Sequence, residues 1–100
     1  MSDLPLKDGQ EAKFELGCLV GTPGSAAALY AAKVDPLDLV ARHATGDWGD
    51  LCLDDKLANE DAVHRGGRLL SRYTLSTDEV VYVITEGDRS VTTLLLPSEY

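Results

Sequence analysis

The chain of 100 residues has few cysteines, few basic side chains and no long apolar run. Its two cysteines, Cys18 and Cys52, do not form a C-x-x-C pair, so we expect neither a disulfide framework nor a zinc site. In a reducing cytosol both should be small buried hydrophobic side chains. No apolar run approaches the roughly 20 residues that span a bilayer, and the polar start "MSDLPLKDGQEAK" lacks the pattern of a secretory signal. We therefore expect a soluble, cytoplasmic protein without a membrane partner.

Basic residues are scarce as well. Nine Lys and Arg side chains stand against 17 Asp and Glu, and the net charge is −8. Binding to nucleic acid needs a Lys/Arg surface that displaces counterions, so this balance disfavours direct contact with nucleic acid. The same charge is compatible with an unknown protein partner that has a basic surface.

Motifs that bind cofactors or carry out catalysis are missing. "GTPGS" lacks the lysine of a P-loop, and the chain contains no G-x-G-x-x-G, G-x-S-x-G, H-E-x-x-H or EF-hand pattern. We therefore expect no cofactor, no bound metal and no catalytic residue. A binding protein explains the sequence better than an enzyme does.

What is present is the composition of a folded domain, with 44% hydrophobic residues. We expect residues 1–12 to be flexible and residues 13–100 to form a single α+β domain. The first helix is predicted after Thr22, a possible N-cap that precedes a proline and an alanine-rich stretch.

A second helix is predicted after Asp35, which again precedes a proline. Its buried face is predicted from an apolar stripe at helical spacing, Leu37, Val40, Ala41 and Ala44. This places His43 on a flank, near the C-terminus of the helix. A third helix is predicted from Asp54, as its N-cap, to the glycine pair at 66–67. It should lie on the surface, because its apolar stripe is thin: Leu57, Ala58, Ala62 and Val63.

Residues 13–22 predict a strand, and after residue 66 the hydrophobic pattern changes to period two. Residues 67–75, 79–85 and 90–97 then predict three strands joined by hairpin-length links, with the second at the centre of the sheet. The predicted fold is α+β: an N-terminal strand, two to three helices, then a three-stranded antiparallel meander, with the helices packed on one face of a four-stranded sheet. The segments "RLLSRYTL" and "SVTTLLL" could expose an edge, so we expect a monomer or a weak dimer.

Polar side chains collect in three places: residues 42–50, residues 59–65 and residues 85–90. If they gather on one side of the sheet, they form a candidate site. One histidine with several carboxylates suits a hard cation or acid–base chemistry, but a helix C-terminus and turn hydrogen bonds account for the same residues. The candidate binding residues are His43, Asp47, Trp48, Asp50, Asn59, Glu60, Asp88 and Arg89.

Two of these residues allow contrasting interpretations. Trp48, the single tryptophan, lies in "GDWGD". It is either a buried plug between the second helix and the sheet or an exposed anchor for a partner. Arg89 lies in the last hairpin link, where it could pair with Glu86 or Asp88, brace the acidic loop at Asp47 or Asp50, or hold an anionic ligand.

Four segments, "TPGSAAAL", "ARHATGDWGDL", "NEDAVHRGGRLLSRYTL" and "VYVITEGDRSVTTLLLPSEY", together resemble a family of small uncharacterised bacterial proteins of plasmids and integrating elements. These are called plasmid-related proteins or labelled as a type I restriction endonuclease subunit M. The resemblance runs from Phe14 to Tyr100, and departs at Tyr82 and Gly87, where Trp and Ala are usual. It implies a mobile-element setting. The restriction label does not suit this chain, because 100 residues without methyltransferase motifs cannot supply the cofactor fold and catalytic motifs that such a subunit needs. The resemblance also gives weight to the matched positions His43, Gly46, Asp47, Trp48, Gly49, Asp50, Asn59, Glu60, Asp88 and Arg89.

We therefore predict a small acidic accessory protein, a non-catalytic protein-binding module that acts through the 43–50 loop, the third helix and the 86–90 hairpin. The alternative is a small enzyme, or a metal- or nucleotide-binding domain, that uses His43, Asp47, Asp50, Glu60 and Arg89. A third interpretation is that these residues only hold the fold together and that the function lies elsewhere on the surface.

Overall fold

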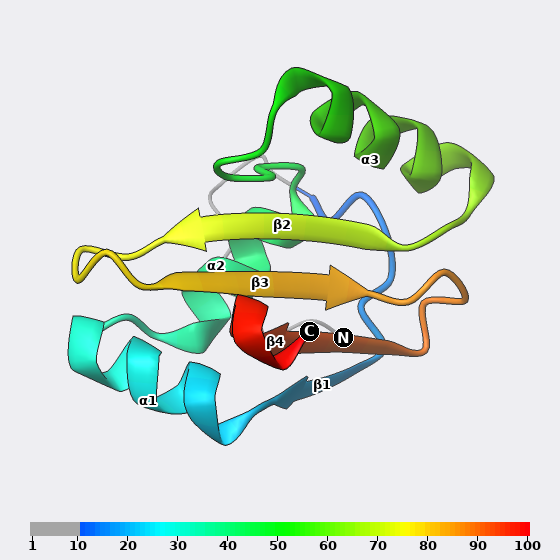
Figure 1. Cartoon of the computed structure of the whole chain (residues 1–100). Coiled ribbons are helices and arrows are strands. Elements are labelled where there is room, and N and C mark those ends of the chain that lie inside the picture. The colour runs from blue at the N-terminus through cyan, green and yellow to red at the C-terminus, as the bar shows by residue number, and fades with distance from the viewer. Residues whose placement is uncertain (1–10) are drawn as a thin grey trace.

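Three α-helices and four strands follow one another along residues 11–100, the part of the chain that the computed structural model describes (Figure 1). The first ten residues of the predicted flexible segment lie outside it. No helix within residues 11–100 has the length and apolar character needed to cross a membrane. The elements are β1 (Cys18–Gly21), α1 (Pro23–Ala32), α2 (Pro36–Ala44), α3 (Leu53–Arg65), β2 (Leu69–Thr74), β3 (Val80–Thr85), β4 (Val91–Leu95) and the 3₁₀ helix η1 (Pro97–Glu99).

The first two helices begin where the sequence predicts. Thr22 and Asp35 each accept a hydrogen bond from a backbone N–H of the first turn, and each is followed by proline. The predicted start of the third helix is wrong by two residues: α3 begins at Leu53 with Cys52 at its N-cap, not with Asp54. Asp54 lies instead in the first turn, where its charge favours the helix N-terminus.

The sheet has the order β1-β4-β3-β2. β2, β3 and β4 pair antiparallel, as predicted, and β3 lies inside the sheet. The N-terminal strand is shorter than predicted and pairs parallel with β4, with Cys18 level with Val91. The sheet is therefore mixed. β4 lies between β1 and β3, so the expectation that "SVTTLLL" exposes an edge is wrong.

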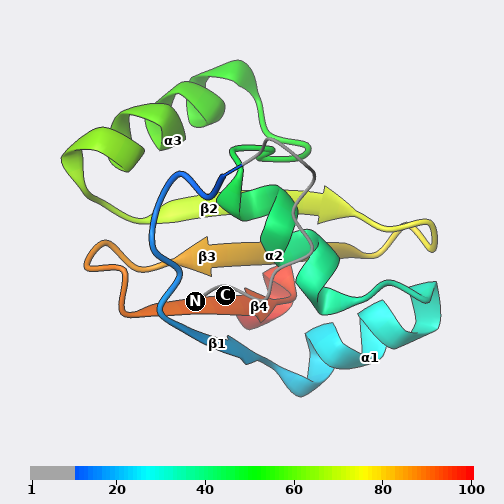
Figure 2. The ribbon, with the colours of Figure 1, turned by 180° about the vertical axis from the view of Figure 1, so that it is seen from behind.

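The helices do not all cover the same face of the sheet. α2 crosses the face seen in Figure 2, and α1 packs its buried side into the same core, whereas α3 lies beyond β2 at the edge of the sheet. η1 lies on the opposite face (Figure 1). The core between α1, α2 and the sheet consists of Ala28, Leu29, Leu39, Val40, Tyr73, Leu75, Val81, Val83 and Leu94.

Two predicted helix faces need correction. On α2, Leu37 is exposed and His43 is fully buried, because hydroxyl groups on the sheet provide partners for its ring. On α3, Leu57 and Ala58 are exposed and Asn59 is buried, because the helix docks on the strand edge through a polar side chain.

The expectation of buried cysteines is also wrong. Cys18 and Cys52 are both free and exposed. Cys18 begins β1, whose four residues all remain exposed at the edge of the sheet. Cys52 is the N-cap of α3, on the outside of the molecule. Neither position lies under another element that would cover it.

Candidate functional site

The "GDWGD" loop runs along the outer edge of β2 as a short added strand. The Arg72 N–H donates to the carbonyl of Trp48 over 3.1 Å, and the Asp50 N–H donates to the carbonyl of Arg72 over 2.6 Å. Gly49 lies between them in a parallel bridge to Arg72. Its φ is +76°, and a Cβ there would overlap the Arg72 carbonyl. Only glycine can bring the loop this close to the strand.

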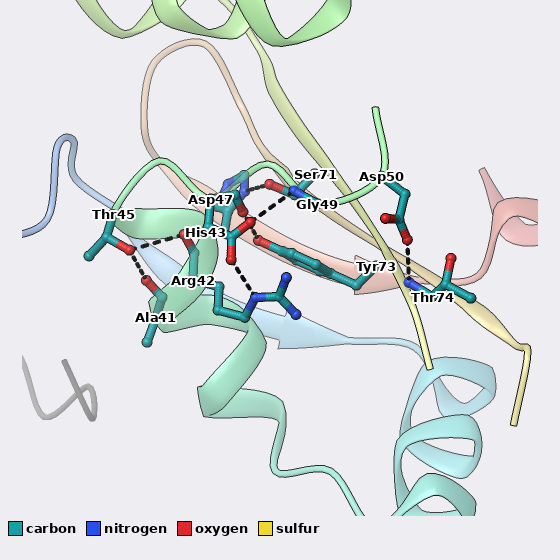
Figure 3. A network of polar contacts seen from close by, with 10 residues as sticks. All are labelled: Ala41, Arg42, His43, Thr45, Asp47, Gly49, Asp50, Ser71, Tyr73 and Thr74. Atoms are coloured by element: carbon teal, nitrogen blue, oxygen red, sulfur yellow. Dashed lines mark hydrogen bonds and ion pairs between the residues drawn. The ribbon is translucent and has the colours of Figure 1, made fainter. Parts of the chain in front are cut away.

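Two further side chains form hydrogen bonds with the outer edge of β2. The Asn59 amide donates to the carbonyl of Leu70 over 2.7 Å and accepts from the Leu70 N–H over 3.2 Å. The Asp50 carboxylate accepts from the Thr74 N–H over 3.2 Å, as Figure 3 shows. The N–H groups of Leu70, Arg72 and Thr74 are therefore all satisfied at the outer edge of β2. The expectation that "RLLSRYTL" exposes an edge is wrong for this reason.

Trp48 is buried, with 3% of its surface exposed. Its indole N–H donates to the Glu60 carboxylate over 2.8 Å, and its ring stacks on Phe14 with centroids 6.1 Å apart. The ring of His43 meets it edge-on at 5.7 Å. The ring is therefore buried, as the plug interpretation predicts, and its contacts are with Phe14, with His43 of α2 and with Glu60 of α3. The exposed-anchor interpretation is wrong.

His43 lies at the centre of a chain of buried hydrogen bonds. Its Nδ1 lies 2.6 Å from Ser71 Oγ, and its Nε2 lies 2.9 Å from Thr85 Oγ1. Thr85 Oγ1 lies 2.7 Å from Thr92 Oγ1, which donates to the carbonyl of Leu16 over 2.7 Å. A Ser–His contact of this length is typical of a nucleophile and its general base. Here, however, both residues are fully buried, so no substrate reaches them.

The carbonyl at the end of this chain determines the position of each proton. A carbonyl only accepts, so the single Thr92 hydroxyl proton points to Leu16, and Thr85 must donate to Thr92. Thr85 then accepts from His43 Nε2–H, which leaves Nδ1 to accept from Ser71. Burial, and secondarily the charge of Arg89, lowers the pKa of His43 from 6.5 to about 3. The ring is neutral at physiological pH. Every buried side-chain nitrogen and oxygen in this series of hydrogen bonds has a partner.

Asp47 joins α2 to the loop (Figure 3). Its carboxylate pairs with Arg42 Nε over 2.7 Å and accepts from the Gly49 N–H over 3.2 Å. Its carbonyl accepts from the Tyr73 hydroxyl. Burial opposes ionisation, but the hydrogen bond and charge of Arg42 outweigh it and lower the pKa of Asp47. This carboxylate holds the turn and is already neutralised by its partner.

Arg89 braces the end of α3 rather than the acidic loop. Its guanidinium donates to the carbonyls of Ala62, Gly67 and Glu86, over 2.8, 2.6 and 3.2 Å, and lies 5.7 Å above the Phe14 ring. It contacts neither Asp47 nor Asp50, so that predicted brace is wrong. The cause is the hairpin itself, which ends beside the C-terminus of α3, where free carbonyls attract a cation.

The structure thus brings the three polar segments together around Phe14 and Trp48. Asp88 lies at the hairpin tip, where it accepts from the Ser90 N–H. Within residues 11–100 no three His, Cys, Asp or Glu side chains gather closely enough to hold a metal ion. No family model, curated protein or solved structure matches the chain.

Sequence reasoning missed the partners that explain these residues. Phe14, the single phenylalanine, links Arg89, His43 and Trp48, although it lies outside β1. The hydroxyl groups that hold His43 come from inward positions of three strands, at Ser71, Thr85 and Thr92. A signal was present, since a hydroxyl among inward apolar side chains needs a buried polar partner.

Proposed function

We propose that the protein is a non-catalytic accessory module that binds a partner protein through the outer face of α3. This outer face comprises Leu53, Asp54, Leu57 and Asp61. The observation that carries the proposal is the exposure of two leucines one helical turn apart, 69% for Leu53 and 56% for Leu57. Apolar side chains at this spacing form the anchors of helix-in-groove recognition.

The way in which α3 packs accounts for these exposed leucines. The helix docks on the sheet through Asn59, whose amide replaces a strand at Leu70, and through Glu60, which binds Trp48. Its polar side therefore faces the protein, and its leucines face solvent. Because these leucines stay in water, the fold does not gain the free energy of burying them. A partner that covers them would gain about one kcal/mol or more per leucine.

The charge of α3 indicates what kind of surface the partner has. α3 carries four carboxylates against two basic side chains, and Arg65 pairs with Asp61 over 2.8 Å. A complementary surface offers an apolar groove with Lys or Arg at its rim. The setting that we propose for this partner is the bacterial cytoplasm, in a cell that carries plasmids or integrating elements, as the resemblance of the sequence implies.

The alternative, a small enzyme or a metal- or nucleotide-binding domain, has less support. It needs His43, Asp47, Asp50, Glu60 and Arg89 around a common space. Both His43 nitrogens are used inside the core, and Arg89 is used on backbone carbonyls. The third interpretation, a structural role for these residues, agrees with their contacts and is compatible with a binding surface on α3.

Affinity capture from a bacterial host, followed by direct binding of each purified partner, tests the proposal. The variant Leu57→Lys should weaken binding at least tenfold, and added salt should weaken binding of the wild type. The matched control is Tyr30→Lys, which changes an aromatic residue on α1 that is 87% exposed and should leave binding unchanged. A partner that binds Leu57→Lys as tightly as the wild type, or that is lost with Tyr30→Lys, would overturn the proposal.

A further inference from the structure

The two edges of the sheet differ in how far their backbone hydrogen-bonding groups are paired. The outer edge of β2 is covered by the Trp48–Asp50 segment, by the Asn59 amide and by the Asp50 carboxylate. At the other edge, β1 pairs with β4 alone. Within residues 11–100 no strand, loop or side chain forms a hydrogen bond with its outer side.

The hydrogen bonds to β4 show which peptide groups of β1 face outward. The Cys18 N–H donates to the carbonyl of Ser90, and the Thr22 N–H donates to the carbonyl of Leu94, each over 3.0 Å. Peptide groups alternate in direction along a strand. The N–H and C=O groups of Leu19 and Gly21 therefore point away from the sheet and are available to another strand.

The surface around this edge is mainly apolar. Leu19 and Val20 are 40% and 43% exposed, and a groove of about 240 Å³ lies beside them, bounded by β1, α1 and the start of α2. Natural sheets protect an open edge with lysine, proline or a bulge, and "CLVG" has none of these. Residues 16–32, which contain β1 and α1, have no charged side chain at all.

We propose that β1 is the interface of a homodimer, in which the β1 strands of two copies pair antiparallel and join the two sheets. A two-fold axis at Val20 makes the pairing self-complementary. Leu19 then lies opposite Gly21 of the second copy and exchanges both hydrogen bonds with it, and the two Val20 side chains face each other as a non-hydrogen-bonded pair.

The distribution of charge favours a second copy of this chain as the molecule that binds the outer edge of β1. In a two-fold contact each chain meets its own surface, which for a chain of net charge −8 is least unfavourable where few charges lie. Residues 16–32 carry no charge of their own, and the Glu99 carboxylate, which accepts from the Thr22 hydroxyl, lies just beyond the end of β1. The outer face of α3 carries Asp54 and Asp61. A charged peptide seated on the same groove would bury an unpaired charge. The remaining repulsion between two acidic chains is screened by salt, so salt should strengthen the dimer.

Sedimentation equilibrium from ~10 µM to ~1 mM protein, a range that covers weak association, tests the dimer. The wild type should shift from monomer to dimer, and the shift should move to lower concentration in higher salt. Leu19→Lys should raise the dissociation constant at least tenfold, whereas the control Leu53→Lys, at the opposite side of the molecule, should leave it unchanged. Circular dichroism checks that both variants are folded. A monomer at every concentration, or a dimer that Leu19→Lys does not weaken, would overturn the proposal.

Disulfide trapping tests the register independently of the lysine variants. In a Cys18→Ser, Cys52→Ser background, Val20→Cys should form an intermolecular disulfide on mild oxidation, because facing residues of a non-hydrogen-bonded pair are close enough to bridge. Leu53→Cys in the same background is the control and should remain reduced. Trapping through Leu53 but not through Val20 would place the contact on α3 and contradict the proposal.

Discussion

Asn59 pairs with the backbone of Leu70 as a neighbouring strand would, donating to its carbonyl over 2.7 Å and accepting from its N–H over 3.2 Å. One side chain thus replaces a peptide group at the edge of the sheet. The contact is nearly closed to solvent, since Asn59 is 5% exposed. It determines which side of α3 faces the protein, and so which side faces outward.

Asn59→Asp should therefore be severely destabilising. The carboxylate cannot donate to the Leu70 carbonyl, and it places a negative charge against that oxygen in a nearly buried position. We expect the free energy of unfolding at pH 7 to fall by about 2–4 kcal/mol, measured by urea denaturation. The exposed substitution Asp55→Asn on the same helix should change it by less than about 0.5 kcal/mol. Equal effects of the two changes would show that the Asn59 contact contributes nothing.

The Trp48–Glu60 contact needs an acceptor rather than a charge. Glu60→Gln keeps an oxygen for the indole N–H and should lower the free energy of unfolding by less than about 1 kcal/mol. Glu60→Ala leaves the N–H of a buried ring without its partner and should cost about 1–3 kcal/mol. Unfolding followed by the fluorescence of the single tryptophan measures both. If Gln costs as much as Ala, the charge and not the hydrogen bond is responsible.

His43 should make the protein sensitive to mild acid. Its pKa falls from 6.5 to about 3 on folding, so the unfolded chain binds a proton that the folded chain excludes. Stability is complete above pH 6.5 and decreases as the pH falls from 6.5 toward 3. The slope approaches about 1.4 kcal/mol per pH unit, which predicts a loss of about 2 kcal/mol at pH 5 relative to pH 7.

Urea denaturation across this range measures the slope, and His43→Gln is the matched variant, because its amide can reach the same hydroxyls but does not titrate. Its stability should be lower at pH 7 and nearly independent of pH between 5 and 7. Asp47 does not interfere, because its pKa is lowered from 3.8 and its contribution is lost only at more acidic pH. A wild-type profile that is flat between pH 5 and 7 would contradict a neutral, buried His43.

Arg89 should hold the C-terminal end of α3 in place. Its backbone has a φ of +62°, and its guanidinium binds the carbonyls of Ala62 and Gly67. Arg89→Gly suits the backbone but removes these contacts, and Arg89→Lys keeps the charge but not the planar fork. Both should cost about 1–2 kcal/mol and speed amide hydrogen exchange at residues 62–68. Unchanged exchange there in both variants would show that the contacts are not needed.

Much of the fold follows from local signals in the sequence. Thr22 and Asp35 start helices because a cap and a following proline act within one turn. The last three strands were predictable because alternation and short links determine antiparallel neighbours. The parallel pairing of β1 with β4 was not, because no local pattern records a contact between residues 18 and 91.

The candidate site was predicted less well for a similar reason. The three polar segments do meet, but their partners lie far along the chain. His43 is buried because Ser71 and Thr85, 28 and 42 residues away, supply hydroxyl groups. Assigning the buried face of a helix from its apolar residues cannot reveal such a position, since histidine is then counted among the polar, exposed residues. The outward leucines of α3 were missed because a side-chain amide, rather than a hydrophobic stripe, orients this helix.

The covered edge of β2 also limits how far the sheet can grow. A sheet with two bare edges can add copies without end and so form fibres, whereas this one, over residues 11–100, has a single place to add a strand. In the proposed dimer, pairing through β1 uses that place and gives a sheet of eight strands. We expect the Trp48–Asp50 segment on β2 to prevent further strands from adding to that sheet.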